Sequence, residues 1–312
     1  MCKYLSEKFD DYIVYGLVRR TSHHNPKIKD LLKWDVELIE GDLTDLSSLS
    51  RSIKLIRPDY LYNFGAQSHV RISFEEPIST FEITGKGVLN CLEAIRTNSP
   101  HTRFYQASSS EMFGKVQETP QTEKTPFFPR SPYGVSKLFG YWITVNYRES
   151  YNIFASNGIL FNHESEVRGL NFVTRKITDG VAQIKYGLAN KLELGNLDSE
   201  RDWMHAEDAI RGAKLILEHN FADDFVLASG KKYSVRDFCK ICFEKGGLGD
   251  YENYVVINPK FVRPAEVDIL LGDSTKARRV LGWVPEISFE NMVDRMLTHD
   301  LRRYENEVKS GN

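Results

Sequence analysis

The sequence predicts an α/β protein with a doubly wound parallel sheet and a second, smaller α/β domain. Through about residue 165, short β-rich runs alternate with helical stretches, which is typical of parallel strands joined by crossover helices. Polar clusters follow several of these runs, and such sheets bind ligands beyond the carboxyl ends of their strands. We therefore expect the clusters to line one crevice.

Apolar periodicity and local breakers define the individual elements. Strands are expected at 12–18, 36–40, 60–64, 103–107 and 153–161. Helices are expected at 46–56, which ends before Pro58, at 78–98 and from Tyr133 onward. Beyond residue 165 the alternation becomes irregular, and helices are expected at 174–186, 206–219, 235–243 and 290–301.

The chain lacks the glycine-rich turn that normally opens a dinucleotide-binding sheet. Such a sheet begins with a strand, a Gly-x-x-Gly-x-x-Gly turn and a helix whose N-terminus holds a pyrophosphate. Residues 1–11 resemble the end of that helix, so we expect the first strand and its turn to be missing. Loss of this central strand would leave backbone groups of both neighbours without partners. The sequence is then an incomplete version of a longer product, which we favour, or a degenerate relative.

Composition is that of a soluble globular protein. Of 312 residues, 41% are hydrophobic and 27% charged, and the net charge of −2 gives no reason to propose a nucleic acid partner. No apolar run approaches the ~20 residues that span a bilayer, and four cysteines do not suggest a disulfide framework, so we expect a cytoplasmic protein without a membrane partner. Cys239 and Cys242 lack a second ligand pair; we interpret them as core or half-buried thiols and predict no metal site.

Tyr133 and Lys137 are the strongest catalytic candidates. Residues four apart share a helix face, so the phenol and the ammonium can point to one place. A tyrosine pKa is normally near ~10, and a nearby cation lowers it by favouring the phenolate. A Tyr-x-x-x-Lys pair alone is weak, but the hydroxyl-rich strand end Ser108–Glu111 lies about one crossover upstream. Together they indicate a base that deprotonates a sugar hydroxyl while hydride leaves the same carbon.

Long strings of residues resemble the extended short-chain dehydrogenase/reductases, and closely the GDP-mannose 4,6-dehydratases. The resemblance runs from Gly16–Arg20 to the last helix. Its clearest strings are Tyr62–Val70, Arg103–Gly114, Arg130–Gly134, Tyr141–Glu149, Gly158–Ser165, Phe172–Lys176, Arg201–Trp203, Arg263–Val267 and Leu271–Asp273. The resemblance implies a Rossmann-like hydro-lyase that converts GDP-D-mannose to GDP-4-keto-6-deoxy-D-mannose, in nucleotide-sugar metabolism and GDP-fucose biosynthesis.

The resemblance also implies four catalytic roles. Tyr133, supported by Lys137, would deprotonate the mannose 4-hydroxyl while hydride passes from C4 to NADP. Glu111 would remove the C5 proton and help the C6 hydroxyl to leave as water, and hydride would then return to C6. Ser109 stands where the family usually has threonine, and its hydroxyl could still bond the 4-oxygen.

NADP is the implied cofactor, because Arg19 and Arg20 follow the strand whose end faces the adenosine ribose, where guanidinium groups suit a 2′-phosphate. The implied cofactor-binding residues are Arg19, Arg20, Asp42, Leu43, Phe64, Gly65, Ala66, Gln67, Ser68, Tyr133, Lys137, His163 and Arg168. Ser79 departs from the family pattern, which has tyrosine there. We expect the N-terminally incomplete cofactor domain at residues 1–165.

The implied substrate-binding residues are Ser68, Ser110, Glu111, Asn162, Val173, Lys176, Arg201, Arg263 and Glu266. Arg201 and Arg263 would neutralise the diphosphate, and Glu266 would accept from the guanosine ribose. Val167 replaces an arginine that the family usually has beside Arg168. Residues 166–312 are expected to be mainly a substrate-binding domain, with segments near 195–230 returning to the first domain.

Two alternatives to the dehydratase stay open. One is a related nucleotide-sugar reductase or epimerase, against which Glu111 argues because those enzymes eliminate no water. The other is a catalytically inactive truncated homologue that only binds nucleotide sugar, which the absent glycine turn suggests. The resemblance also implies a homodimer or homotetramer.

Overall fold

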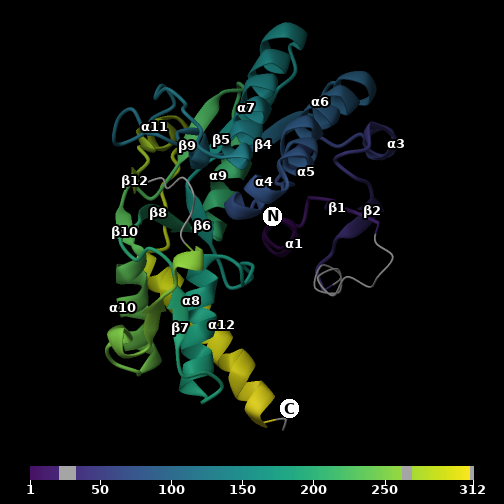
Figure 1. Ribbon diagram of the computed structural model, residues 1–312. Helices are drawn as coiled ribbons and strands as arrows, with labels where there is room; N and C mark the ends of the chain where they lie inside the picture. Colours follow the sequence, from purple (N-terminus) through teal and green to yellow (C-terminus); the bar gives the residue numbers. More distant parts are fainter. Residues whose placement is uncertain (21–32, 262–268, 310–312) are drawn as a thin grey trace. The chain divides into compact units, whose positions relative to one another are not determined.

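The computed structural model describes residues 1–20, 33–261 and 269–309, and the chain divides into two compact units (Figure 1). The first unit comprises Met1–Ser108, Pro132–Gly158 and Ile210–Asp224. The second comprises Ser109–Ser131, Ile159–Ala209 and Phe225–Asn312. Each unit has a hydrophobic core of its own. The division into a cofactor domain and a substrate domain stays a prediction.

Strands and helices alternate through the first unit. Its elements are α1 (Cys2–Lys8), β1 (Tyr15–Val18), β2 (Glu37–Glu40), α3 (Leu46–Ile56), β3 (Tyr60–Asn63), α4 (Val70–Glu75), α5 (Pro77–Phe81), the π-helical turn η1 (Glu82–Lys86), α6 (Gly87–Asn98), β4 (Arg103–Ser109), α7 (Pro132–Tyr151) and β5 (Ala155–Leu160). The five predicted strands are confirmed, with shifted ends. Among the described residues β1 and β2 form one parallel pair, and a second sheet has the order β3-β4-β5-β9, where β9 is Asp224–Leu227. The loss of a first strand and its turn stays a prediction.

One face of the β3–β4 pair packs against helices. Leu61 of β3 lies opposite Phe104 of β4 in the parallel register, and two residues further along Asn63 lies opposite Gln106. Because residues i and i+2 of a strand share a face, the apolar pair and the polar pair lie on the same side. Phe104 joins a core that includes Leu49, Ile53, Val88, Leu92 and Ile95 from α3 and α6. Asn63 and Gln106 are therefore polar groups on a core-facing surface.

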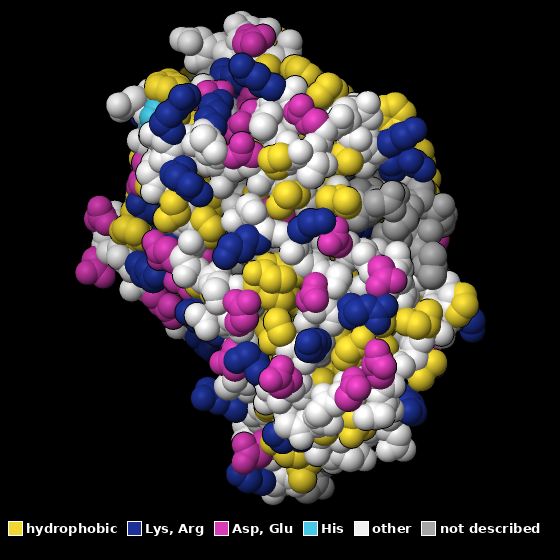
Figure 2. All heavy atoms as spheres, turned by 90° about the vertical axis from the view of Figure 1, so that its left-hand side faces the viewer, with side chains coloured by type: hydrophobic (Ala, Val, Ile, Leu, Met, Phe, Trp, Pro, Cys, Tyr) yellow, Lys and Arg dark blue, Asp and Glu magenta, His cyan; other side chains and the backbone are white. Residues whose placement is uncertain are grey.

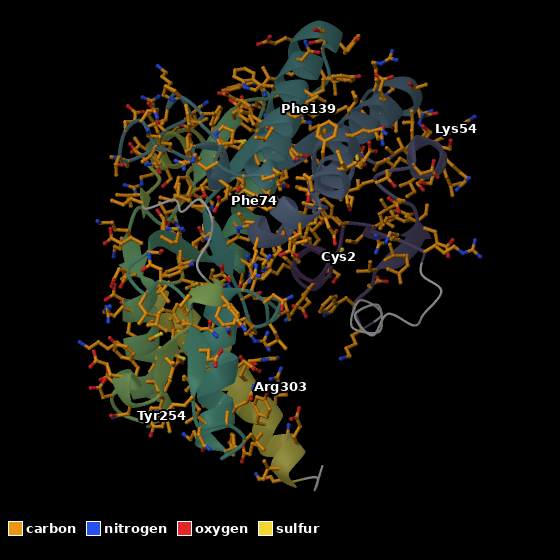
Figure 3. The ribbon with its side chains drawn as sticks, in the orientation of Figure 1. Cys2, Lys54, Phe74, Phe139, Tyr254 and Arg303 are labelled. Carbon is orange, nitrogen blue, oxygen red and sulfur yellow. The ribbon has the colours of Figure 1, made fainter. Side chains whose placement is uncertain are left out.

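The long helix expected at 78–98 is interrupted in the structure. It divides into α5, η1 and α6, so that a π-helical turn at Glu82–Lys86 lies inside an otherwise α-helical stretch. Phe81, at the end of α5, meets Phe139 of α7 edge-on with ring centroids 5.4 Å apart (Phe139 is labelled in Figure 3). Apolar periodicity does not distinguish a single π-helical turn from α-helix, so the sequence does not predict this interruption. Such turns are frequent at functional sites.

The opposite face of β3 and β4 carries tyrosines. Tyr62 lies opposite Tyr105 in the register, and their ring centroids are 6.0 Å apart. Tyr60 continues this row toward Tyr12, at 6.3 Å between centroids, and Tyr12 meets Phe9 at 5.6 Å. This aromatic row joins the segment after α1 to the sheet.

The second unit contains shorter strands and the remaining helices. Its elements are the 3-10 turn η2 (Ser110–Met112), β6 (Asn162–Glu164), α8 (Val173–Lys185), β7 (Leu192–Leu194), β8 (Glu200–His205), β10 (Lys232–Ser234), α10 (Val235–Gly246), η3 (Tyr251–Asn253), β11 (Val255–Ile257), η4 (Pro259–Phe261), β12 (Ile269–Leu270), α11 (Thr275–Leu281) and α12 (Phe289–Lys309), while α9 (Ala206–Glu218) crosses the unit boundary. Strand β8 pairs with β6, β10 and β12, and β7 pairs with β11. The four helices predicted beyond residue 165 are confirmed as α8, α9, α10 and α12.

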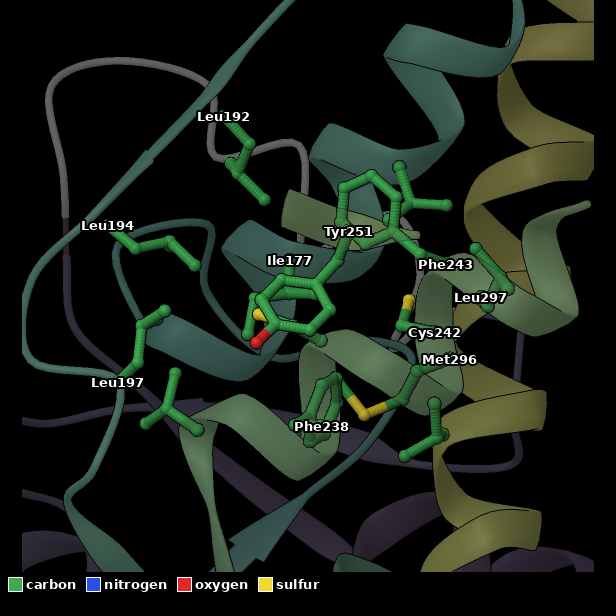
Figure 4. Close-up of a cluster of buried hydrophobic side chains, with 14 of the residues drawn as sticks. Ile177, Leu192, Leu194, Leu197, Phe238, Cys242, Phe243, Tyr251, Met296 and Leu297 are labelled. Atoms are coloured by element: carbon green, nitrogen blue, oxygen red, sulfur yellow. The ribbon is translucent and has the colours of Figure 1, made fainter. Parts of the chain in front are cut away.

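The core of the second unit lies among α8, α10 and α12 (Figure 4). Ile177 of α8, Phe238 and Phe243 of α10, and Met296 of α12 are buried in it. Cys239 and Cys242 are fully buried in the same cluster. The interpretation of this C-x-x-C pair as core thiols is confirmed.

A buried ion pair connects α8 to α12. The guanidinium of Arg175 donates to both carboxylate oxygens of Asp300, with the shortest N···O distance 2.6 Å, and Asp300 is fully buried. Thr178 Oγ1 donates to the same carboxylate at 2.7 Å. The remaining arm of Arg175 donates to the backbone carbonyls of Glu166 and Arg168. The pair therefore holds the segment before α8.

The visible surface has a mixed charge distribution. On the face shown in Figure 2, basic, acidic and hydrophobic side chains are interspersed. Among the residues that the structure describes, no helix is both long and apolar enough to cross a bilayer. The expected homo-oligomer and cytoplasmic location stay predictions.

We expect Gly158→Ala to destabilise the protein by about 1–3 kcal/mol, the usual cost of overpacking a core. A Cβ at this position would lie 2.1 Å from the buried hydroxyl of Tyr105. Gly169→Ala is the control, because a Cβ there would make only an ordinary contact of 3.5 Å with Phe172. The measurement is the free energy of unfolding in denaturant, and equal stabilities for both variants would contradict the described packing.

Candidate active site

Helix α7 presents Tyr133 and Lys137 on one buried face. The exposed fractions of the two residues are 8% and 4%, and Lys137 Nζ lies 5.8 Å from the centroid of the Tyr133 ring. Lys137 Nζ donates a hydrogen bond of 2.6 Å to the backbone carbonyl of Ala107, near the end of β4. The helical spacing of four residues thus places the phenol and the ammonium beside the carboxyl end of a central strand.

Burial lowers the pKa of Lys137 to about 8. The cause is desolvation, which disfavours the charged ammonium in a low-dielectric surrounding. A lysine with this pKa exchanges its proton near neutral pH, which suits a group that supports an acid–base step.

The loop after β3 is held by hydrogen bonds to side chains of β3 and of the π-turn. Gly65 N–H donates to Asn63 Oδ1 at 3.1 Å, and Gln67 N–H donates to Thr84 Oγ1 of the π-turn at 3.0 Å. A Cβ on Gly65 would lie 2.5 Å from Leu43 Cδ1, so the loops after β2 and β3 are in close contact. The predicted cofactor residues Leu43 and Gly65 are therefore brought together. Phe64, Ala66 and Ser68 lie in the same loop.

Three further predicted cofactor residues follow β1 and β2. Arg19 and Arg20 follow β1 and are exposed, and Asp42 follows β2. Hydrogen bonds from the Thr44 N–H and hydroxyl, each 2.8 Å, and the nearby charge of Arg19 hold the pKa of Asp42 below its usual value. The Asp42 carboxylate is thus kept ionised beside a guanidinium.

In the second unit, Glu111 lies in the 3-10 turn η2. Ser109 caps this turn, because its Oγ accepts from the Glu111 N–H at 3.2 Å, and Ser110 is buried. Gly114 lies two residues after the turn; it has φ +52°, and a Cβ added there would lie 2.0 Å from the Phe128 carbonyl oxygen. Only glycine fits there, and its geometry fixes the chain directly after Glu111.

Other predicted residues gather around β6 and the start of α8. Arg168 Nε lies 3.1 Å from the carboxylate of Glu164, and its guanidinium stacks 3.5 Å from the Phe172 ring centroid. Burial raises the pKa of Glu164, against the opposing effects of Arg168 and Thr174. Asn162 and His163 precede Glu164 on β6, and His163 Nδ1 lies 3.0 Å from the Phe161 carbonyl oxygen.

The remaining substrate candidates lie on α8 and β8. Val173 begins α8, and Lys176 Nζ lies 3.4 Å from the Phe261 ring centroid. Arg201 is buried in β8, opposite Tyr233 of β10 and Leu270 of β12, and donates to the Glu200 carbonyl at 2.8 Å. The predicted residues Arg263 and Glu266 lie outside the described residues.

Sequence reasoning missed the polar groups that support these candidates. Asn63 and Gln106 are bonded to each other and, through the Ala107 carbonyl, to Lys137. The sequence feature that could have revealed them is the glutamine within the strand Arg103–Ala107, because a buried polar side chain in a strand requires a hydrogen-bond partner. Arg175, which holds the Arg168 backbone, was missed because its partner Asp300 is distant in sequence.

The parallel sheets and the Tyr-x-x-x-Lys helix define an extended short-chain dehydrogenase/reductase. The solved structure of RMD from Pseudomonas aeruginosa complexed with NADPH matches with a TM-score of 0.78 and 25% identity, over 90% of this chain and 92% of that one. A double mutant of DesIV, a dTDP-glucose 4,6-dehydratase from Streptomyces venezuelae, has the same fold, with a TM-score of 0.82 and 22% identity over 95% of this chain and 90% of that one.

The family follows from the sequence comparisons. A family model described as GDP-mannose 4,6 dehydratase matches residues 1–296. A GDP-mannose 4,6-dehydratase from Yersinia enterocolitica is 46% identical, over 97% of this chain and 90% of its own length. The chain belongs to the GDP-mannose 4,6-dehydratase family, and it is an enzyme of the hydro-lyase class.

We expect Lys137→Met to stabilise the protein at pH 7 by about 2 kcal/mol. A pKa lowered from 10.5 to about 8 by burial is worth on the order of 3 kcal/mol, and the lost bond to Ala107 offsets about 1 kcal/mol. The cost of burying the charge is fully present below pH 8 and disappears as the pH rises toward 10.5. The advantage of the variant in unfolding free energy must therefore shrink between these values.

The exposed lysine Lys54 supplies the control for this measurement, because Lys54→Met removes a charge that stays in water (Figure 3). The same gain in both variants would contradict the burial argument.

Proposed function

We propose that this chain converts GDP-D-mannose to GDP-4-keto-6-deoxy-D-mannose and water, with NADP as a bound cofactor. The observation that carries the proposal is the family match over residues 1–296, which includes Tyr133, Lys137 and Glu111. The buried Tyr133–Lys137 pair on α7 supports it, because a phenol beside an ammonium can serve as the base at a sugar hydroxyl.

The residues of the first unit fit a nicotinamide dinucleotide. The exposed guanidinium groups of Arg19 and Arg20 follow β1, and Asp42 and Leu43 follow β2. A Cβ on Gly65 would lie 2.5 Å from Leu43 Cδ1, so the close approach of the loops after β2 and β3 favours glycine at this position. Arginine suits a 2′-phosphate, so NADP is the proposed form. When bound, the cofactor supplies hydride acceptance from C4 and hydride return to C6, so that no net redox change occurs.

Side chains of this protein would carry out the proton transfers. Tyr133, assisted by the Lys137 ammonium, would take the proton of the 4-hydroxyl as the C4–H bond breaks to leave a ketone. This ketone acidifies the C5–H bond. Glu111 would take the C5 proton and give it to the C6 hydroxyl, which leaves as water together with the C–O bonding pair. One carboxyl group would thus act first as base and then as acid. When hydride returns to C6, C5 takes up a proton, and release of the proton held by Tyr133 balances this uptake, so that the net change is the loss of one water.

Substrate binding would use polar groups of the second unit. The charges of Lys176 and Arg201 suit a diphosphate, and the Asn162 amide suits a sugar hydroxyl. Burial lowers the pKa of Lys176, and the charge of Glu193 opposes this effect. A bound anion would likewise favour the charged ammonium of Lys176.

The direct test is to incubate the protein with GDP-mannose and either NADP+ or NAD+. We expect a 4-keto-6-deoxy product by mass spectrometry and NMR, higher turnover with NADP+, and no accumulation of reduced cofactor. Accumulating NADPH, or an epimerised sugar that retains its C6 oxygen, would contradict dehydration.

Glu111→Gln should lower turnover by ~10²- to 10⁴-fold, because an amide can neither accept the C5 proton nor protonate the leaving hydroxyl. Binding of NADP+, measured by calorimetry, should be retained. Glu290→Gln on the exposed start of α12 is the matched control and should keep full turnover. Turnover of the Glu111 variant near that of the control would remove this carboxylate from the mechanism.

A further inference from the structure

Two buried amides lie side by side on the face of the β3–β4 pair that packs against helices. Asn63 of β3 and Gln106 of β4 are register partners, so their side chains emerge on the same face. Asn63 Nδ2 donates to Gln106 Oε1 at 2.8 Å. Asn63 is 5% exposed and Gln106 is fully buried. Amides in such a place require partners, because an unsatisfied buried polar group costs about 1–3 kcal/mol.

The two outer ends of this amide pair reach groups that belong to the candidate active site. Asn63 Oδ1 accepts from the backbone N–H of Gly65, in the loop predicted to bind the cofactor, at 3.1 Å. Gln106 Nε2 donates to the Ala107 carbonyl at 3.1 Å. Lys137 Nζ donates to that same carbonyl at 2.6 Å. A carbonyl oxygen has two lone pairs, so it can accept both donors together.

Helix α7 passes close to Gln106, because a glycine lies at the point of contact. Gly140 follows Lys137 by three residues, and a Cβ there would lie 3.6 Å from Gln106 Nε2 and 3.1 Å from Val88 Cγ2. The backbone of α7 thus approaches Gln106 within one turn of the lysine. A continuous path of hydrogen bonds runs from Gly65 through Asn63 and Gln106 to the carbonyl that receives the ammonium.

We propose that Asn63 and Gln106 are positioning residues, which fix the Ala107 carbonyl and thereby the Lys137 ammonium relative to the loop after β3. This inference rests on the proposed role of Lys137 in dehydration. It goes further by assigning a function to two side chains outside the Tyr-x-x-x-Lys pair. A displacement of a catalytic group by about 1 Å can cost ~10²-fold in rate, so loss of the amide path acts on turnover rather than on substrate binding.

The experiment uses Gln106→Leu and the double variant Asn63→Leu/Gln106→Leu. The single change leaves the Asn63 amide without its acceptor, whereas the double change removes both partners, which is the better tolerated replacement. We expect kcat to fall by at least about tenfold in each folded variant, with KM for GDP-mannose within about twofold of the original.

Thr102→Val is the matched control. Thr102 is fully buried just before β4, and its hydroxyl donates to the Pro58 carbonyl at 2.5 Å. Its loss should lower stability and leave kcat unchanged. A kcat of the double variant equal to that of this control overturns the proposal.

A second measurement does not depend on activity. Denaturant midpoints of Gln106→Leu, Lys137→Met and their combination form a double-mutant cycle. We expect non-additive shifts for this pair and additive shifts when Thr102→Val replaces Gln106→Leu. If the unaltered protein forms no product, the proposed function fails, and the cycle still decides the link between Gln106 and Lys137: additive shifts refute it.

Discussion

The candidate chemistry of the first unit depends on one buried contact, the hydrogen bond from the Lys137 ammonium to the Ala107 carbonyl. An ammonium in a low-dielectric surrounding is unfavourable unless it has hydrogen-bond acceptors. The contact satisfies one donor of this charge and orients the group along α7, toward the ring of Tyr133. Burial lowers the pKa of Lys137, and the Ala107 carbonyl orients its ammonium. This hydrogen bond therefore connects β4 to α7 at the lysine that is proposed to support the acid–base step.

Buried polar contacts fix local geometry in both units. In the first unit, amides and hydroxyls fix loops at the carboxyl ends of strands, as with Gln67 and Thr84. Ion pairs do the same in both units: Asp224 pairs with Arg148 in the first unit, and in the second unit Glu164 pairs with Arg168 and Asp300 with Arg175. Buried ion pairs often contribute little net stability, but loss of one partner is expensive. Such pairs are better understood as fixing geometry than as increasing stability.

Much of this architecture is predictable from sequence, because strands and helices follow local periodicity. Helix α3 begins and ends where its cap at Asp45 and the following Pro58 require. That Tyr133 and Lys137 share one helix face follows from their spacing of four residues. The π-turn at Glu82–Lys86 could not be predicted, since its apolar pattern is still helical. Nor could the partnership of Asn63 with Gln106, which depends on a parallel register between segments separated by a whole crossover.

The ion pair of Arg175 and Asp300 has a consequence for the far end of the chain. Asp300 belongs to the last helix, yet its partner holds the carbonyls of Glu166 and Arg168, which precede α8. A C-terminal truncation that removes Asp300 would leave the guanidinium of Arg175 buried without its carboxylate partner, at a cost of about 3–5 kcal/mol in stability. The terminal helix is therefore an integral support of a segment well over a hundred positions earlier, and not a dispensable tail.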